Sequence, residues 1–83
     1  MKATAFSKWI GTFLSEKGID LEETLEVEGP SGMNWIPVGS LVEMMRSAPK
    51  HEQDGIKAMF VRIDFANGNV RHYLTHLARA VAQ

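Results

Sequence analysis

Two histidines near the carboxyl end of the chain have a spacing that suits metal binding. His72 and His76 are four residues apart, so a helix would place both on one face, within reach of a single zinc ion. Tyr73 stands where a zinc protease would carry a glutamate. Three other residues have side chains that could complete a ligand set: His51, Glu52 and Asp64. A solvated histidine pair is the simpler interpretation, so we predict no resident metal or cofactor and keep His72 and His76 as the candidates.

The same segment carries a basic face. At about 100° per residue, its basic and hydroxyl side chains lie opposite its apolar stripe, and Arg62 on the preceding helix can extend the strip. Such a face can bind phosphates and gain affinity by releasing counterions. The candidate nucleic-acid contacts are Arg62, Arg71, His72, His76 and Arg79. No recognition-helix motif or stacking-aromatic pattern accompanies them, so an ordinary polar helix face is the simpler interpretation and nucleic-acid binding is the alternative.

Motifs for catalysis are missing from the sequence. The chain has no cysteine, which excludes disulfides, thiol catalysis, thiolate zinc sites and iron–sulfur clusters. The run Gly29–Pro30–Ser31–Gly32 is not a phosphate loop, because no Gly-Lys-Ser/Thr follows it. There is also no Gly-x-Ser-x-Gly elbow. We therefore predict that the protein is not an enzyme and has no small-molecule substrate.

Four apolar residues do not fit the expected cores of their elements. Trp35 lies in an extended piece before Pro37, Met44 is off the stripe of its helix, and two further residues lie off the main face of theirs. These four candidate partner-binding residues are Trp35, Met44, Val61 and Phe65. Because a small domain gains stability by burying such residues in a symmetric dimer, we predict a non-enzymatic protein-interaction module that self-associates.

Helical periodicity dominates the elements that must position these residues. The pattern predicts helices over residues 4–17, from Pro37 to about residue 47, from Pro49 to the Asn67–Gly68 pair, and over residues 69–81. We expect Thr4 and Asn69 to act as N-caps. Gly18 stands where a helix favours a left-handed residue after its last turn. Three large side chains at helical spacing are expected in the core: Trp9, Met45 and Met59.

Two segments leave alternatives open. Residues 19–36 contain a short alternating run and a Gly-Pro-Ser-Gly turn, which favour an irregular or hairpin insert, although a short helical turn fits the first part. Residues 61–65 also alternate, and Asn67–Gly68 is a hairpin signal, so residues 58–66 could pair with 69–74. We favour helices there. The predicted fold is mainly α, a small bundle of about four helices with an insert at 19–36; the alternative is α+β with a hairpin around Asn67–Gly68.

Length and charge fit one domain over residues 1–83. The chain is 45% hydrophobic and 23% charged, near globular averages, and its formal charge of −1 gives no general attraction for nucleic acid. Residues 1–45 hold seven acids and three bases, whereas residues 46–83 hold three acids and six bases. An acidic block at residues 16–28 is most simply a solvated loop, but it could dock a basic partner.

The sequence also bears on location. No apolar run approaches the ~18 residues that a membrane span needs. Polar residues interrupt the apolar segment near the amino end, so we predict no signal peptide and a cytoplasmic protein. Small size, lack of cysteine and divided charge are similar to those of accessory proteins of phages and plasmids, although no motif carries this likeness.

Overall fold

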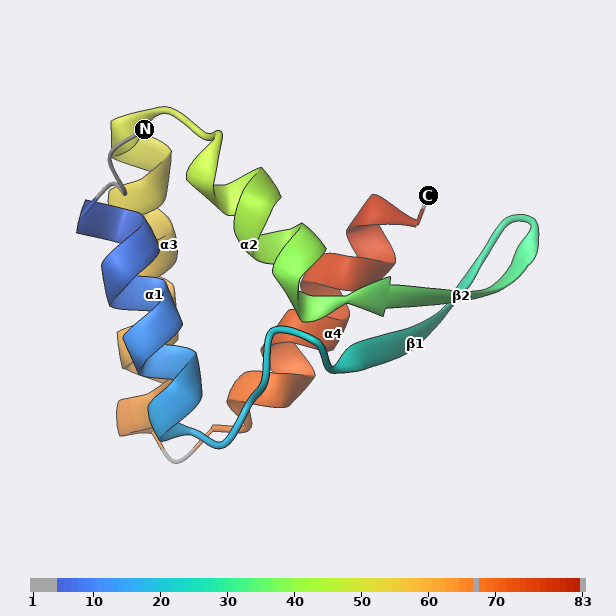
Figure 1. Ribbon diagram of the computed structural model, residues 1–83, viewed down its shortest axis with the longest axis horizontal. Helices are drawn as coiled ribbons and strands as arrows, with labels where there is room; N and C mark the ends of the chain where they lie inside the picture. Colours follow the sequence, from blue (N-terminus) through green and yellow to red (C-terminus); the bar gives the residue numbers. More distant parts are fainter. Residues whose placement is uncertain (1–4, 67, 83) are drawn as a thin grey trace.

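Four helices and one β-hairpin make up the part of the chain that the computed structural model describes, residues 5–66 and 68–82. In chain order they are α1 (Ala5–Glu16), β1 (Thr24–Gly29), β2 (Gly32–Pro37), α2 (Val38–Arg46), α3 (Lys50–Phe65) and α4 (Val70–Val81). Helices α1 and α3 lie together at one end of the molecule, α2 and α4 lie in the middle, and the hairpin projects at the other end (Figure 1). The predicted fold class, a small helical bundle with a hairpin insert, is confirmed.

Aromatic side chains join three of the helices through the core. Phe60 of α3 is fully buried, and its ring contacts Phe13 of α1 at 5.7 Å and Tyr73 of α4 at 5.0 Å between centroids. Trp9 stacks on Phe13 at 4.9 Å, and it is half-buried against the core. Aromatic pairs of this geometry add to the apolar area that they bury, so Phe60 stabilises the contacts among α1, α3 and α4.

Helix α1 ends in a cap at Gly18, the residue that the sequence indicated for a left-handed conformation. Gly18 has φ +73°, its N–H donates to the Ser15 carbonyl at 3.0 Å, and the Ile19 N–H donates to the Leu14 carbonyl at 2.9 Å. These are the two bonds of a Schellman cap, which needs a left-handed residue that glycine adopts without steric cost. Ile19 and Leu14 are both buried, so the cap also turns the chain back into the core.

The hairpin packs one face on the helices and leaves the other outside. Strands β1 and β2 are antiparallel, with Glu26 opposite Trp35 and Glu28 opposite Met33. Leu25 and Val27 of β1 are buried, whereas the alternating residues Thr24, Glu26 and Glu28 are exposed. Helix α4 lies against β1. The insert at residues 19–36 is therefore an irregular loop followed by a hairpin whose second strand runs one residue further, to Pro37.

Residues 58–65 belong to α3 and residues 70–74 to α4, so the alternative hairpin is wrong. Helix α3 continues to Phe65, and the Gly68 N–H then donates to the Ile63 carbonyl at 2.7 Å, which turns the chain back onto the end of the helix. Asn69 caps α4 as expected, since its Oδ1 accepts from the His72 N–H at 3.1 Å. The alternation over residues 61–65 is overridden because a helix places Phe60 in the core.

Two smaller expectations are corrected, and two fall on residues outside those that the structure describes. Pro37 ends β2 and is the N-cap of α2, with ψ 142°, so it precedes the first helical turn. Met45 is buried as predicted, but Met59 is 38% exposed because it lies beside the stripe that Phe60 centres. Thr4 and Asn67 lie outside the described residues.

Helix α3, with 16 residues, is the longest described helix, and none of the described helices is long and apolar enough to cross a membrane.

Candidate interaction site

Large apolar side chains are exposed on several elements of the described chain. All four residues that the sequence indicated as partner-binding are among them: Trp35, Met44, Val61 and Phe65. The four come from three elements, β2, α2 and α3, and the structure does not bring them all to one surface. The hairpin and α3 lie at opposite ends of the molecule (Figure 1). The exposed apolar residues therefore form separate surfaces, which we describe in turn.

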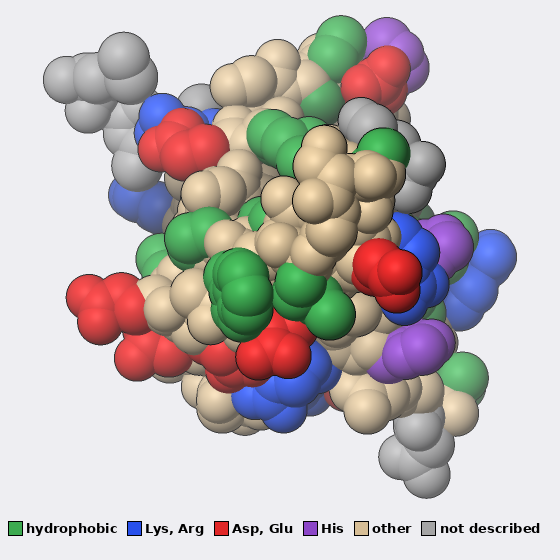
Figure 2. Space-filling model, turned by 90° about the vertical axis from the view of Figure 1, so that its right-hand side faces the viewer, with side chains coloured by type: hydrophobic (Ala, Val, Ile, Leu, Met, Phe, Trp, Pro, Cys, Tyr) green, Lys and Arg blue, Asp and Glu red, His purple; other side chains and the backbone are tan. Residues whose placement is uncertain are grey.

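The outer face of the hairpin combines apolar and acidic side chains. Trp35 is 60% exposed and Met33 is 51% exposed, and their cross-strand partners on the same face are Glu26 and Glu28. The Trp35 Nε1–H donates to Glu26 Oε1 at 3.1 Å. We call these four residues the hairpin face. On the side of the molecule where the hairpin lies, hydrophobic side chains gather in the middle, with carboxylates beside them (Figure 2).

Sequence reasoning had found only Trp35 on the hairpin face. The sequence pattern does not single out Met33, and it places Glu26 and Glu28 in the acidic block at residues 16–28. The signal that places them together is the strand register, since directly opposite residues of an antiparallel pair share a face. The register depends on the position of the turn: Pro30 and Ser31 form it, which sets Gly29 opposite Gly32.

The last two turns of α3 carry a second apolar surface. Phe65, the final residue of the helix, is 92% exposed, and Val61 is about half exposed. The two are four residues apart, so they lie together on one helix face. The opposite side of α3 holds Phe60 in the core. We call Val61 and Phe65 the α3 strip.

Met44 belongs to a third surface, an apolar hollow between α2 and α4. The hollow has a volume of about 230 Å³, and the residues that line it are all apolar types: Leu41, Met44, Met45, Leu77, Ala80 and Val81. Its walls include the buried Leu41 and Met45, so much of it is the outer surface of the core. A partner-binding role for Met44 stays a prediction.

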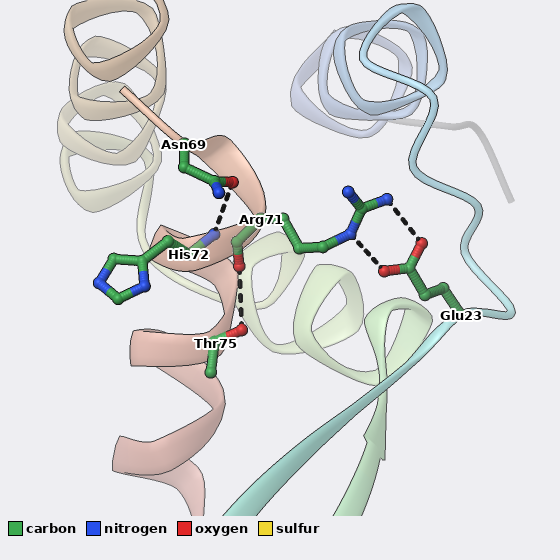
Figure 3. Close-up of polar contacts among 5 residues, drawn as sticks. All are labelled: Glu23, Asn69, Arg71, His72 and Thr75. Atoms are coloured by element: carbon green, nitrogen blue, oxygen red, sulfur yellow. Dashed lines mark hydrogen bonds and ion pairs between the residues drawn. The ribbon is translucent and has the colours of Figure 1, made fainter. Parts of the chain in front are cut away.

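The basic face of α4 differs from its sequence-based description in one respect. Arg71 points toward Glu23 of the loop before β1, and it donates from Nε to Oε2 at 2.6 Å and from Nη2 to Oε1 at 3.0 Å (Figure 3). These hydrogen bonds, with the guanidinium charge, lower the pKa of Glu23, and the carboxylate raises the pKa of Arg71. The Arg71 charge is thus compensated within the chain.

The other residues of the basic face remain outward. His72, His76 and Arg79 are exposed on α4, and Arg62 is exposed on α3. The His72 ring points away from the Arg71–Glu23 pair (Figure 3). Within residues 5–66 and 68–82, no three histidine, aspartate or glutamate side chains come together as a metal site. Nucleic-acid binding by this face and metal binding by His72 and His76 both stay predictions.

Comparisons with known proteins gave no assignment: the chain matches none of the protein-family models, curated proteins or solved structures against which it was compared. The hairpin face, the α3 strip and the Arg71–Glu23 pair are therefore the features of the molecule that bear on its function.

Proposed function

We propose that the protein is a non-enzymatic protein-interaction module that self-associates through the α3 strip. The observation that carries the proposal is the 92% exposure of Phe65. Removing a phenylalanine side chain from water contributes about 1.5–3 kcal/mol. The exposed Phe65 side chain gains none of this stabilisation in a single chain, but it would gain it if a second molecule covered it. The proposal includes the cytoplasmic location expected from the sequence.

The spacing of the α3 strip suits a second copy of the chain. A two-fold axis passing between Val61 and Phe65 would set two α3 helices antiparallel. Each Phe65 would then pack on Val61 of the other copy, because both residues lie on the same helix face. Ala58, one turn earlier, is small and exposed, so it leaves space for the helices to approach. The same two side chains thus supply both halves of the contact.

Sedimentation equilibrium over micromolar to millimolar protein concentrations tests this proposal. The native chain should form a dimer, and Phe65→Asp should remain a monomer, since the dimer would bury two carboxylates without partners. Met59→Asp is the matched control, because it adds the same charge to an exposed apolar position on another side of α3. Circular dichroism would show that both variants keep their helices.

A cross-linking experiment tests the geometry independently. The chain has no cysteine, so Val61→Cys and Phe65→Cys each introduce a unique thiol. Mixed under oxidising conditions, the two variants should form the heterodimeric disulfide faster than either forms a homodimer. A native chain that stays monomeric throughout, or a Met59→Asp variant that dissociates as readily as Phe65→Asp, would overturn the proposal.

A further inference from the structure

The edge of β2 offers backbone groups that the two-stranded sheet does not use. The Val38 N–H donates to the Glu23 carbonyl at 2.8 Å, which fixes the phase of the ladder: in the register, Leu25↔Ile36 and Val27↔Asn34 are the hydrogen-bonded pairs. The alternate pairs, Glu26↔Trp35 and Glu28↔Met33, are therefore non-hydrogen-bonded. Their N–H and C=O groups point away from the ladder, so Met33 and Trp35 present theirs along the outer edge of β2.

Strand β2 lacks the features that protect other edge strands. Natural edges carry charged side chains, a bulge or an internal proline. The sequence of β2, GMNWIP, has no charge, its register with β1 is continuous, and its proline is the last residue. Met33 and Trp35 also expose their side chains on the hairpin face. One strand edge thus combines unused backbone groups with two large apolar side chains.

The charge beside this edge is acidic. Glu26 Oε1 is held at 3.1 Å from the Trp35 indole nitrogen, which brings a carboxylate against the aromatic ring. Glu28 lies opposite Met33 on the same face. A strand added to β2 would lie about 4.8 Å from it, and Lys or Arg side chains on that face would reach both the indole and the carboxylate. Cation–π contact and charge attraction would then act together.

We infer that β2 binds an extended, basic segment of another protein as a third strand, with Lys or Arg alternating with apolar residues. Backbone hydrogen bonds to Met33 and Trp35 would supply affinity, and the hairpin face would supply the preference for basic side chains. This inference goes beyond self-association through the α3 strip, because it uses a different element and a different occupant. It does not depend on the dimer, and Phe65→Asp separates the two.

A peptide titration followed by NMR tests the inference on the full chain. The probe is the capped peptide Lys-Val-Lys-Val-Lys-Val-Lys, and the observed signals are the backbone amides of Met33 and Trp35 in ¹⁵N-labelled protein. The peptide should shift these amides and slow their hydrogen exchange. Trp35→Ala should weaken binding about tenfold, and Glu26→Gln about two- to fivefold. Phe65→Asp should bind as the native chain does.

Controls on the peptide distinguish strand addition from general attraction. Methylating the backbone nitrogens of one alternate set of residues should abolish binding, and methylating the other set should leave it, because only one set faces β2. The Glu-Val counterpart should not bind. Equal effects of the two methylation patterns, unchanged binding by Trp35→Ala, or no binding at millimolar peptide would overturn the inference. Self-association that is lost in Trp35→Ala but kept in Phe65→Asp would overturn it too, since a second copy would then occupy the edge.

Discussion

Arg71 at the start of α4 holds Glu23, 48 residues earlier in the chain, through two parallel hydrogen bonds. The Glu23 carbonyl also accepts from the Val38 N–H, where β2 passes into α2. One residue thus ties the loop before the hairpin to the beginnings of two helices. The guanidinium fork matches a carboxylate in a way that a lysine ammonium does not, which makes this contact specific to the pair.

The Arg71–Glu23 pair should make stability depend on pH. Because the pKa of Glu23 is lowered in the folded chain, its contribution is complete above the unfolded-state pKa and is lost as pH falls through the folded-state value. Glu23→Gln should therefore unfold at lower urea concentration than the native chain at about pH 7, and the two should converge once the pH falls below the lowered folded-state pKa of Glu23. Both side chains are partly exposed, 28% and 48%, so the difference should be small.

Salt and a conservative variant serve as controls for that pair. High salt should reduce the difference between the native chain and Glu23→Gln, since exposed charges are screened. Arg71→Lys should retain only part of the stability that the pair contributes, because an ammonium cannot make both of the parallel hydrogen bonds that the guanidinium makes to Glu23. A difference that stayed constant from neutral to acid pH would show that Glu23 acts through packing and not through its charge.

The N-cap of α4 should contribute measurably to stability. Asn69 Oδ1 accepts from the His72 N–H at 3.1 Å, and removing such a cap costs about 1 kcal/mol. Asn69→Ala should lower the free energy of unfolding by that amount, and Asn69→Asp or Asn69→Ser should retain most of it. Chemical denaturation of the four proteins in parallel measures this. Equal loss in all three variants would mean that the amide nitrogen, and not the oxygen, is the important group.

Truncating two neighbouring residues of α3 to alanine should lower the free energy of unfolding by very different amounts. Phe60 is fully buried among Phe13 and Tyr73, so Phe60→Ala should cost about 3–5 kcal/mol. Met59 is 38% exposed, and Met59→Ala should cost far less. Urea unfolding curves for the two variants test this contrast. Similar losses would indicate that Met59 is covered in solution, contrary to the exposure seen here.

The nucleic-acid alternative makes a distinct prediction because Glu23 neutralises one of its candidate arginines. If the α4 face binds phosphates, Glu23→Gln should raise affinity by releasing Arg71, and Arg79→Ala should lower it. Fluorescence anisotropy with labelled mixed-sequence DNA and RNA, at about 50 and about 200 mM salt, would detect the change. Absence of binding by both the native chain and Glu23→Gln at the lower salt would exclude this role.

Much of the helical framework follows from the sequence alone, since it depends on local signals. Gly18 ends α1, Asn69 begins α4, and the apolar stripes mark the buried faces, because capping and periodicity act within one or two turns of chain. The exposure of Phe65 and Met44 was also readable, since each lies off the stripe of its own helix. These features need no knowledge of which helix packs where.

Tertiary structure decided what depends on pairs of distant residues. Residues 61–65 alternate like a strand, so the sequence favours a helix there without excluding a hairpin. The burial of Phe60 between α1 and α4 stabilises the helix, because core packing outweighs local propensity. The pairing of Arg71 with Glu23 spans 48 positions and leaves no periodic trace. Likewise, the register that sets Glu26 beside Trp35 and turns the amides of β2 outward depends on which strand pairs with which, and a shift of one residue would reverse both faces.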